Sequence, residues 1–384
     1  MKRTGRLMHR VYSWRNLLLA AARARRGKRS RPNVAQFEFH QETELLALQR
    51  QLQSGRYEPG PFRTFTIFEP KRREISVAPY RDRVVHHAVC NLLSPVFEPT
   101  FIHESFACRI GKGTHAAVDL AQRLMRRFPY VLKTDIARFF PTIDHEVLLG
   151  KLARKLKDRE LLRLLEVIVR HPFPAQQPCP LFPGDHLFTR LERTCGLPIG
   201  NQTSQFFGNV MLNAFDHFVK ENLRAPGYVR YVDDFLVFGQ STAELRMVCD
   251  EIRQFLQVER LRLNPSKTVI SRSADGVRFL GYHVTPTGRS LPRQTRVRFR
   301  RRLTRWQLAY ARGELTQAEI GLRLAGWLGH ARHARCEPWL SRLLERTVFV
   351  RSSTVDSTIQ NTTNDVREET GGESADGDTS TSTK

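Results

Sequence analysis

Two adjacent carboxylates, Asp233 and Asp234, lie in the segment YVRYVDDFLVF between two runs rich in Val, Tyr, Leu and Phe. Both runs have the residue types of β-strands, so the acidic pair falls at the turn of a predicted hairpin. Like charges held this close repel each other. A hard divalent cation such as Mg²⁺, commonly shared between one or two carboxylates and substrate phosphates, would relieve that repulsion. The alternative is an Asp-Asp turn favoured by local hydrogen bonds to the backbone.

A third carboxylate, Asp135, favours the metal interpretation. It follows a predicted strand, Tyr130 to Lys133, in the segment YVLKTDIARFFPTIDHE. An Asp at a strand end and the Asp pair of a distant hairpin can converge on two metal ions. Such ions activate an attacking hydroxyl and stabilise a leaving oxygen. This is the chemistry of nucleotidyl transfer.

Seven ordered segments between Arg63 and Val284 resemble the reverse transcriptase family. They are PKRREISVAPYRDRVVHHA, HESFACRIGKGTHAA, KTDIARFFPTIDH, GLPIGNQTSQFFGNVMLNAFDHF, YVRYVDDFLVF, LNPSKT and VRFLGYHV. The resemblance implies an RNA-directed DNA polymerase. It also implies an α+β, right-hand polymerase fold with fingers, a palm of antiparallel sheet plus helices, and a helical thumb. A non-catalytic RNA-binding scaffold is disfavoured because all three carboxylates are present.

The resemblance assigns roles to the residues of the metal centre. Asp135 and Asp233 match the ligands of both catalytic metals, Asp234 matches the third carboxylate, and Ile136 matches a backbone carbonyl ligand. The implied cofactor is a pair of Mg²⁺ ions, with Mn²⁺ as the alternative. Lys267 resembles the lysine that protonates the departing pyrophosphate, and a surface lysine is its alternative.

Further positions match the contacts to the incoming dNTP and the primer. Lys71 and Arg73 resemble the basic pair that grips the triphosphate, and Arg81 is a weaker candidate. Phe140 matches an aromatic that stacks under the deoxyribose and blocks a 2′-hydroxyl. A core role is the alternative for Phe140 and the preferred interpretation of Phe139. The remaining matches are Ile199, Gly200 and Gln205 near the nucleotide and Phe279, Leu280 and Gly281 in the primer grip.

The segment around Ile199 departs from most of the family. Most members have Gln-Gly followed four residues later by Ser-Pro, whereas this chain has Ile199-Gly200 and then Ser204-Gln205. This pattern is similar to the reverse transcriptases of bacterial diversity-generating retroelements. That resemblance implies error-prone copying of a template RNA into cDNA, with a small basic accessory protein as a partner. An antiviral-defence or otherwise domesticated bacterial enzyme is the alternative.

The charge of the chain agrees with a nucleic-acid partner. The net charge is +24, and the acidic last 34 residues leave +28 on the first 350. Such a surface attracts polyanions, with a bare basic surface as the alternative. A predicted helix after Pro292 has apolar residues inward and arginines outward. These arginines are candidates for contacting the backbone of a nucleic-acid duplex, and a helix that is merely solvated is the alternative. The candidates are Arg296, Arg298, Arg300, Arg301, Arg302 and Arg305.

The six cysteines lack paired spacing, so we expect free thiols in a bacterial cytoplasm, and no segment is long enough to span a membrane. The predicted helices run from Leu7 to Arg26, Phe39 to Leu52, Arg81 to Leu93, Asp144 to Val169, Thr203 to Glu221 and Ser241 to Gln257. We expect five segments. They are a basic N-terminal helix and arm (1–38), fingers (39–127), a palm (128–285), a basic helical thumb (286–350) and a disordered acidic tail (351–384).

Overall fold

The computed structural model describes residues 3–68, 72–174, 178–186 and 188–351. The chain divides into two compact units, Met1–Val277 and Arg278–Lys384, and each is described here by itself. This division is coarser than the five expected segments, which stay a prediction. The expected tail, apart from Arg351, lies outside the described residues.

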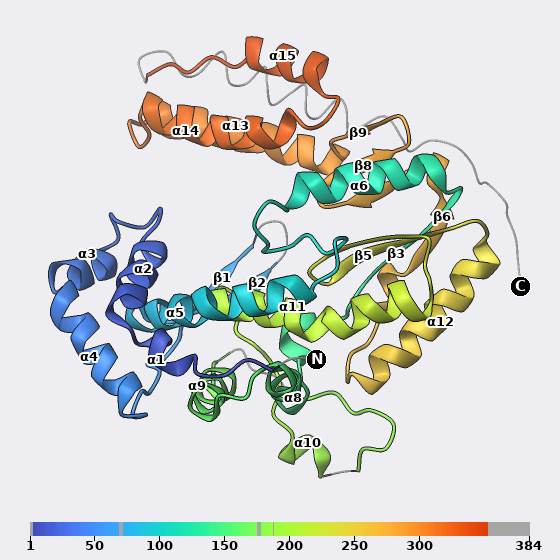
Figure 1. Cartoon of the computed structure of the whole chain (residues 1–384). Helices are drawn as coiled ribbons and strands as arrows, with labels where there is room; N and C mark the ends of the chain where they lie inside the picture. Colours follow the sequence, from blue (N-terminus) through green and yellow to red (C-terminus); the bar gives the residue numbers. More distant parts are fainter. Residues whose placement is uncertain (1–2, 69–71, 175–177, 187, 352–384) are drawn as a thin grey trace, which may run out of the picture. The chain divides into compact units, whose positions relative to one another are not determined.

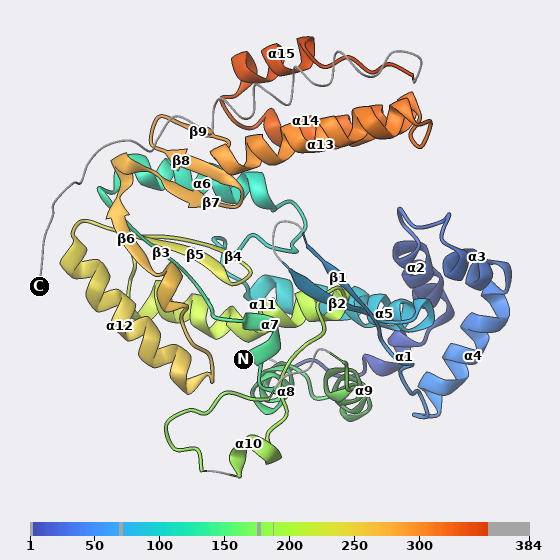
Figure 2. The same ribbon diagram turned by 180° about the vertical axis from the view of Figure 1, so that it is seen from behind.

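A four-stranded antiparallel sheet forms the centre of the first unit, with strand order β4-β5-β3-β6. Helix α6 lies on one face of this sheet, and α11 and α12 lie on the other (Figures 1 and 2). This mixture of helices and antiparallel sheet confirms the predicted α+β class. The strands are β3 (Tyr130–Asp135), β4 (Gly227–Tyr231), β5 (Asp234–Gly239) and β6 (Val269–Arg272), and the helices are α6 (Thr114–Arg127), α11 (Gln202–His217) and α12 (Thr242–Val258).

The chain before the sheet forms a helical layer and a hairpin. The hairpin pairs β1 (Arg63–Ile67) with β2 (Arg73–Val77). The helices are α1 (Met8–Val11), α2 (Trp14–Ala24), α3 (Pro32–Phe39), α4 (Gln41–Gln53) and α5 (Tyr80–Phe97). Helix α5 continues past Pro95, so the prediction that it ends before this proline is wrong.

The prediction of one helix from Leu7 to Arg26 is also wrong, because the helix breaks after Val11. Ser13 has extended backbone angles and its hydroxyl donates to the Arg10 carbonyl. Asn16 then donates to the carbonyl oxygens of Val11 and Ala88, at 2.9 and 3.0 Å, which fastens α2 to α5. The break therefore lets α2 pack into the core of the first unit.

The predicted helix from Asp144 to Val169 is two helices, α8 (His145–Lys155) and α9 (Arg159–Arg170). Asp144, where this helix was predicted to begin, caps α8 by accepting from Val147 N. The break occurs at Asp158, whose carboxylate accepts from Leu161 N in α9 and from Leu7 N and Met8 N. One side chain thus caps a helix and holds the N-terminal segment.

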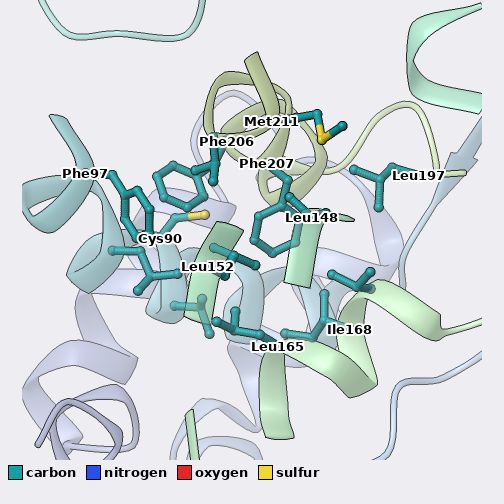
Figure 3. Close-up of a cluster of buried hydrophobic side chains, with 14 of the residues drawn as sticks. Cys90, Phe97, Leu148, Leu152, Leu165, Ile168, Leu197, Phe206, Phe207 and Met211 are labelled. Carbon is teal, nitrogen blue, oxygen red and sulfur yellow. The ribbon is translucent and has the colours of Figure 1, made fainter. Parts of the chain in front are cut away.

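Helices α5, α8, α9 and α11 share one apolar core, which Figure 3 shows. Phe97 of α5 and Phe206 of α11 meet edge to face with ring centroids 5.5 Å apart. Two short helices, α7 (Phe139–Thr142) and α10 (Thr189–Glu192), complete the first unit with a π-helical turn at Phe218–Asn222. The core fixes α11, which carries several side chains of the site described below.

The second unit consists of a small sheet and three helices. The strands are β7 (Val277–Phe279), β8 (Tyr282–Thr285) and β9 (Gly288–Ser290), and the helices are α13 (Arg293–Ala311), α14 (Gln317–Ala331) and α15 (Glu337–Glu345). Phe299 stacks on Trp327 with ring centroids 3.4 Å apart, which joins α13 to α14. Within the described residues, no helix is both long enough and apolar enough to cross a bilayer.

Replacing Asp158 by alanine should lower the free energy of unfolding by about 2 kcal/mol, because a helix cap and two further acceptor contacts are lost. Burial alone would raise the pKa of Asp158, but its backbone N–H donors outweigh burial and lower it. A depressed folded pKa gives stability that is present above the unfolded pKa and is lost as pH falls through the folded pKa. Urea unfolding between pH 7 and pH 2 measures both effects.

Asp158→Asn is the matched control, since it keeps an oxygen acceptor but removes the charge. It should retain part of the stability and lose only the contribution that Asp158 makes to the acid-side pH dependence of the wild type. An unchanged urea midpoint in Asp158→Ala would contradict the assigned role.

Candidate active site

The strands bring the three predicted carboxylates to one end of the central sheet. In the β3–β5 ladder Asp135 is directly opposite Asp234. Asp233 precedes Asp234 in the tight turn between β4 and β5, and its carbonyl accepts from Ile136 N at 3.1 Å. Residues almost one hundred positions apart in sequence therefore become neighbours through backbone pairing alone.

The turn that carries Asp233 is strained. Val232 has a φ of 57°, in the left-handed region that β-branched residues rarely adopt. Such a conformation costs of the order of 1–3 kcal/mol and persists only where surrounding contacts impose it. One contact is direct, because Arg230 Nη1 donates to the Val232 carbonyl at 3.0 Å.

Arg230 is itself fixed by a buried network. Its side chain is fully buried and forms two hydrogen bonds of 2.6 Å to the Asp216 carboxylate, which also accepts from the Tyr228 hydroxyl. Arg230 Nη2 donates to Ser105 Oγ at 2.9 Å, and Arg230 N donates to the Glu104 carbonyl. Strand β4, helix α11 and the segment before α6 are thus joined directly behind the carboxylate turn.

Sequence reasoning missed this network, although two charged residues in apolar segments of the sequence indicate it. Arg230 is a charged residue within an apolar strand, and Asp216 is an acid within the apolar run of α11. Buried charges are found paired, so each residue predicts a partner of the opposite sign. The signal did not say which acid pairs with which base.

The electrostatics of the turn disfavour charged carboxylates. Burial raises the pKa of Asp233, with Arg73 and Arg230 partly opposing this. Burial also raises the pKa of Asp234, to about 6, with Lys133 opposing and Asp233 adding to the rise. These two groups would gain from any cation that came close to them.

The open oxygens of the site match the donors that Mg²⁺ prefers. The buried atoms Asp135 Oδ1 and Asp234 Oδ1 have no hydrogen-bond partner. Carboxylate oxygens of this kind suit Mg²⁺, so the donor chemistry of the predicted ligands fits a divalent ion. In the part of the chain described, however, no three His, Cys, Asp or Glu side chains form a ready-made metal cluster. The ammonium of Lys267 instead binds Asp135 Oδ2 and supplies positive charge there.

Of the predicted basic pair Lys71 and Arg73, the structure describes Arg73. Arg73 begins β2, is exposed, and lies close enough to Asp233 for its charge to lower the pKa of that carboxylate. Lys71 lies outside the described residues. The structure therefore brings one member of the predicted pair toward the carboxylates.

Arg81 is engaged elsewhere. Its guanidinium binds Gln51 Oε1 and the Glu58 carbonyl, and it lies over the Tyr57 ring with 5.4 Å to the centroid. These contacts join α5 to the end of α4 and explain the residue structurally. A role for Arg81 at the nucleotide stays a prediction.

The segment containing Ile199 is attached to β2. The Ile199 carbonyl accepts from Ser76 N at 3.1 Å. Asn201, 1% exposed, donates to the Ser76 carbonyl and accepts from Ala78 N, at 2.9 and 3.1 Å. Gly200 has a φ of 117°, and a Cβ there would lie 2.9 Å from an Ile75 methyl. One backbone bond and two bonds of the Asn201 side chain thus fasten this turn to β2.

Asn201 is a second residue that sequence reasoning missed. Its side-chain amide copies the donor and acceptor of a backbone peptide, which only the structure reveals. Ile199 is half-buried and Gln205 is exposed at the start of α11. Their contacts with a nucleotide stay a prediction.

Phe139 and Phe140 differ in burial. Phe139 is 2% exposed, which confirms its predicted place in the core. Phe140 is half-buried, with ring centroids 5.3 Å from Phe139. A Cβ at Gly208 would lie 3.2 Å from the Phe139 ring and 3.4 Å from the Phe140 ring, so glycine there leaves space for both.

The remaining candidates belong to the second unit. Phe279 is 1% exposed, and Leu280 and Gly281 both have positive φ, which makes a tight turn between β7 and β8. The expectation that all six α13 arginines point outward is only partly right. Arg298, Arg301 and Arg305 are exposed, whereas Arg296, Arg300 and Arg302 are half-buried, with Arg296 over the Trp339 ring.

Opposed strand-end carboxylates, a strained acidic turn and a lysine on the first carboxylate define the palm of a nucleic-acid polymerase. The chain matches the family model "Reverse transcriptase (RNA-dependent DNA polymerase)" over residues 69–284 and belongs to that family.

Curated relatives include protein YkfC of Escherichia coli, 27% identical over 283 residues, with 63% of this chain and 71% of YkfC covered. The group II intron-encoded protein LtrA of Lactococcus lactis is 21% identical over 309 residues, and the match covers 63% of this chain and 50% of LtrA. The chain thus spans half the length of this second relative. Among solved structures, apo telomerase from Candida tropicalis is 16% identical with a TM-score of 0.42, covering 66% of this chain and 60% of that one.

Replacing Arg230 by methionine should lower the free energy of unfolding by about 3–5 kcal/mol, because the buried Asp216 carboxylate loses its counter-ion. The double variant Arg230→Met/Asp216→Leu removes both charges and should recover most of that loss. Chemical denaturation of wild type, both single variants and the double variant gives the coupling energy. Additive effects of the two substitutions would show that the pair is not coupled.

Proposed function

We propose that this chain copies a template RNA into cDNA, by attack of a primer 3′-hydroxyl on the α-phosphate of a dNTP. The observation that carries the proposal is the pairing of Asp135 with Asp234 beside the Asp233 turn, within the residues matched by the family. The relatives are matched over only part of their length, so the activity of the whole chain, its template and its primer are part of the proposal.

Asp135, Asp233 and Asp234 would hold two Mg²⁺ ions, with Mn²⁺ as the alternative and the Ile136 carbonyl as a further ligand. When bound, such ions supply activation of the attacking hydroxyl and stabilisation of the leaving oxygen. The chain's own groups do the rest. The unpartnered Oδ1 atoms of Asp135 and Asp234 and the raised pKa values of Asp233 and Asp234 support this assignment.

Basic side chains would handle the triphosphate. Arg73, with Lys71, would bind its oxygens from the β1–β2 hairpin, since guanidinium and ammonium groups both suit phosphate. Lys267 is held on Asp135, beside the carboxylates, from where its ammonium could donate a proton to the departing pyrophosphate. Phe140 would lie under the deoxyribose, which its half-buried ring permits.

We further propose that synthesis is error-prone, as in a diversity-generating retroelement, with a small basic accessory protein as partner. An antiviral or domesticated bacterial role is the alternative. The six cysteines are not joined in disulfides, which suits the reducing cytoplasm of a bacterium. The motif around Ile199 carries the retroelement proposal, and its attachment to β2 supports a place near the nucleotide.

Asp233→Asn should reduce primer extension on an RNA template about a thousandfold, which corresponds to about 4 kcal/mol of transition-state stabilisation. RNA affinity should change little, because it depends on basic side chains elsewhere. Primer-extension rates and RNA-binding isotherms test this. Asp250→Asn, at an exposed carboxylate of α12, is the matched control. Near wild-type extension by Asp233→Asn would reject the two-metal assignment.

Ile199→Gln should raise copying fidelity about fivefold, because a glutamine amide can add one hydrogen bond of about 1 kcal/mol near the incoming nucleotide. The effect should be largest at template adenines, if the retroelement resemblance holds. Sequencing cDNA made from one template by wild type and variant measures it. Ile110→Gln, at a side chain that is 99% exposed, is the control. Identical error spectra for all three proteins would remove Ile199 from the fidelity mechanism.

A further inference from the structure

Arg83 of α5 is a buried cation whose guanidinium lacks a counter-ion among the described residues. The residue is 8% exposed, its Nε has no hydrogen-bond partner, and its guanidinium lies 5.1 Å from the Tyr80 ring centroid. Burial lowers the pKa of Arg83, and the nearby charge of Arg31 lowers it further. A buried charge without a partner is costly, so this position needs a compensating anion.

Other basic groups gather around Arg83. Burial lowers the pKa of Lys28, and the charges of Arg83 and Arg31 add to the effect. Burial also lowers the pKa of His87 to about 4, with Lys28, Arg23 and Arg83 adding to it. Arg83 and His87 are one turn apart on α5 and therefore share a face of that helix.

The loop between α2 and α3 carries Lys28 and Arg31, which both lie close enough to Arg83 for their charges to interact with it. Gly27 has a φ of 67°, which permits the sharp turn that closes with Lys28 N donating to the Arg25 carbonyl at 2.8 Å. Arg31 N then donates to the Lys28 carbonyl at 3.1 Å. Helices α2 and α3 both pack against α5, as Figure 1 shows.

The acid Glu38 of α3 is paired with a different base. Glu38 binds Arg25 Nη1 through Oε2 at 2.5 Å and acts on the pKa of Tyr80. Within the described residues, the charges that act on Arg83, Lys28 and His87 belong to basic side chains and to Tyr80. Lys28, Arg31 and Arg83 therefore form a positively charged cluster, whereas Glu38 is paired with Arg25.

We propose that Lys28, Arg31 and Arg83 form a binding site for a phosphate group. Phosphate carries negative charge and several acceptor oxygens, which suit the fixed donors of arginine and the ammonium of lysine. The group could belong to an RNA backbone or to free inorganic phosphate. The site uses none of the palm carboxylates, so it stands independently of the polymerase activity.

Thermal unfolding of the full chain tests the site directly. The melting temperature Tm of wild type in phosphate-free buffer should rise by about 2–4 °C when inorganic phosphate reaches tenfold its Kd. Arg83→Met should show no such rise, whereas Arg246→Met, at an exposed arginine of α12, should respond like wild type. Without phosphate, Arg83→Met should melt no lower than wild type, because it removes an uncompensated charge.

Lys28→Met repeats the test at a surface turn if Arg83→Met does not fold. Binding of a labelled single-stranded RNA 12-mer then distinguishes the two sources of phosphate. A contact to the RNA backbone predicts that Arg83→Met reduces the slope of log K against log salt by about 0.7, with Arg246→Met unchanged. A Tm rise in wild type that Arg83→Met abolishes, together with an unaltered salt slope in that variant, identifies free phosphate as the ligand. The same Tm response to phosphate in wild type and both site variants would overturn the proposal.

Discussion

The ion pair between Arg230 and Asp216 lies where strand β4, helix α11 and the segment around Ser105 meet. Its geometry is set by two hydrogen bonds from a fully buried guanidinium, so neither partner can shift without exposing an unpaired charge. The same guanidinium holds the carbonyl of Val232 and so imposes an unfavourable backbone conformation on the acidic turn. The position of Asp233 relative to β3 follows from this constraint and from the β3–β5 register.

The charges of the palm divide into two kinds. Behind the turn, Arg230 and Asp216 neutralise each other's charge and form a rigid support. In the turn and at the end of β3, the buried Oδ1 atoms of Asp135 and Asp234 have no hydrogen-bond partner, and Asp233 and Asp234 have raised pKa values. The ammonium of Lys267 binds Asp135 there. A low-dielectric site with unsatisfied negative groups strengthens its interaction with any cation that enters. The structural support and the open carboxylate oxygens therefore belong to different residues around the β4–β5 hairpin.

Local patterns in the sequence were sufficient to pick out the three carboxylates, and the family resemblance that their segments carry was sufficient for the class of fold. Alternating apolar residues marked β3 and the β4–β5 hairpin, and Asp144 was recognisable as a helix cap. The errors arose where a distant partner decides the local structure. Asp158 breaks a helix because it binds residues 7 and 8, and Asn201 resembles an ordinary loop residue until β2 lies beside it. The pairing of Arg230 with Asp216 depends on a helix and a strand whose packing no short-range pattern specifies.

The Arg230 network also bears on the order in which the chain can fold. Its contacts join residues 104–105, 216 and 230, and Lys267 reaches back to Asp135 across 132 positions. Contacts of such long sequence separation require the closure of large loops and form late compared with helices and hairpins. A ribosome must therefore synthesise the chain well beyond Asp234 before its carboxylates can be held in their final arrangement. A nascent or cleaved fragment that ends before Lys267 would have the three carboxylates and the Arg230 network, but neither β6 nor the lysine that binds Asp135.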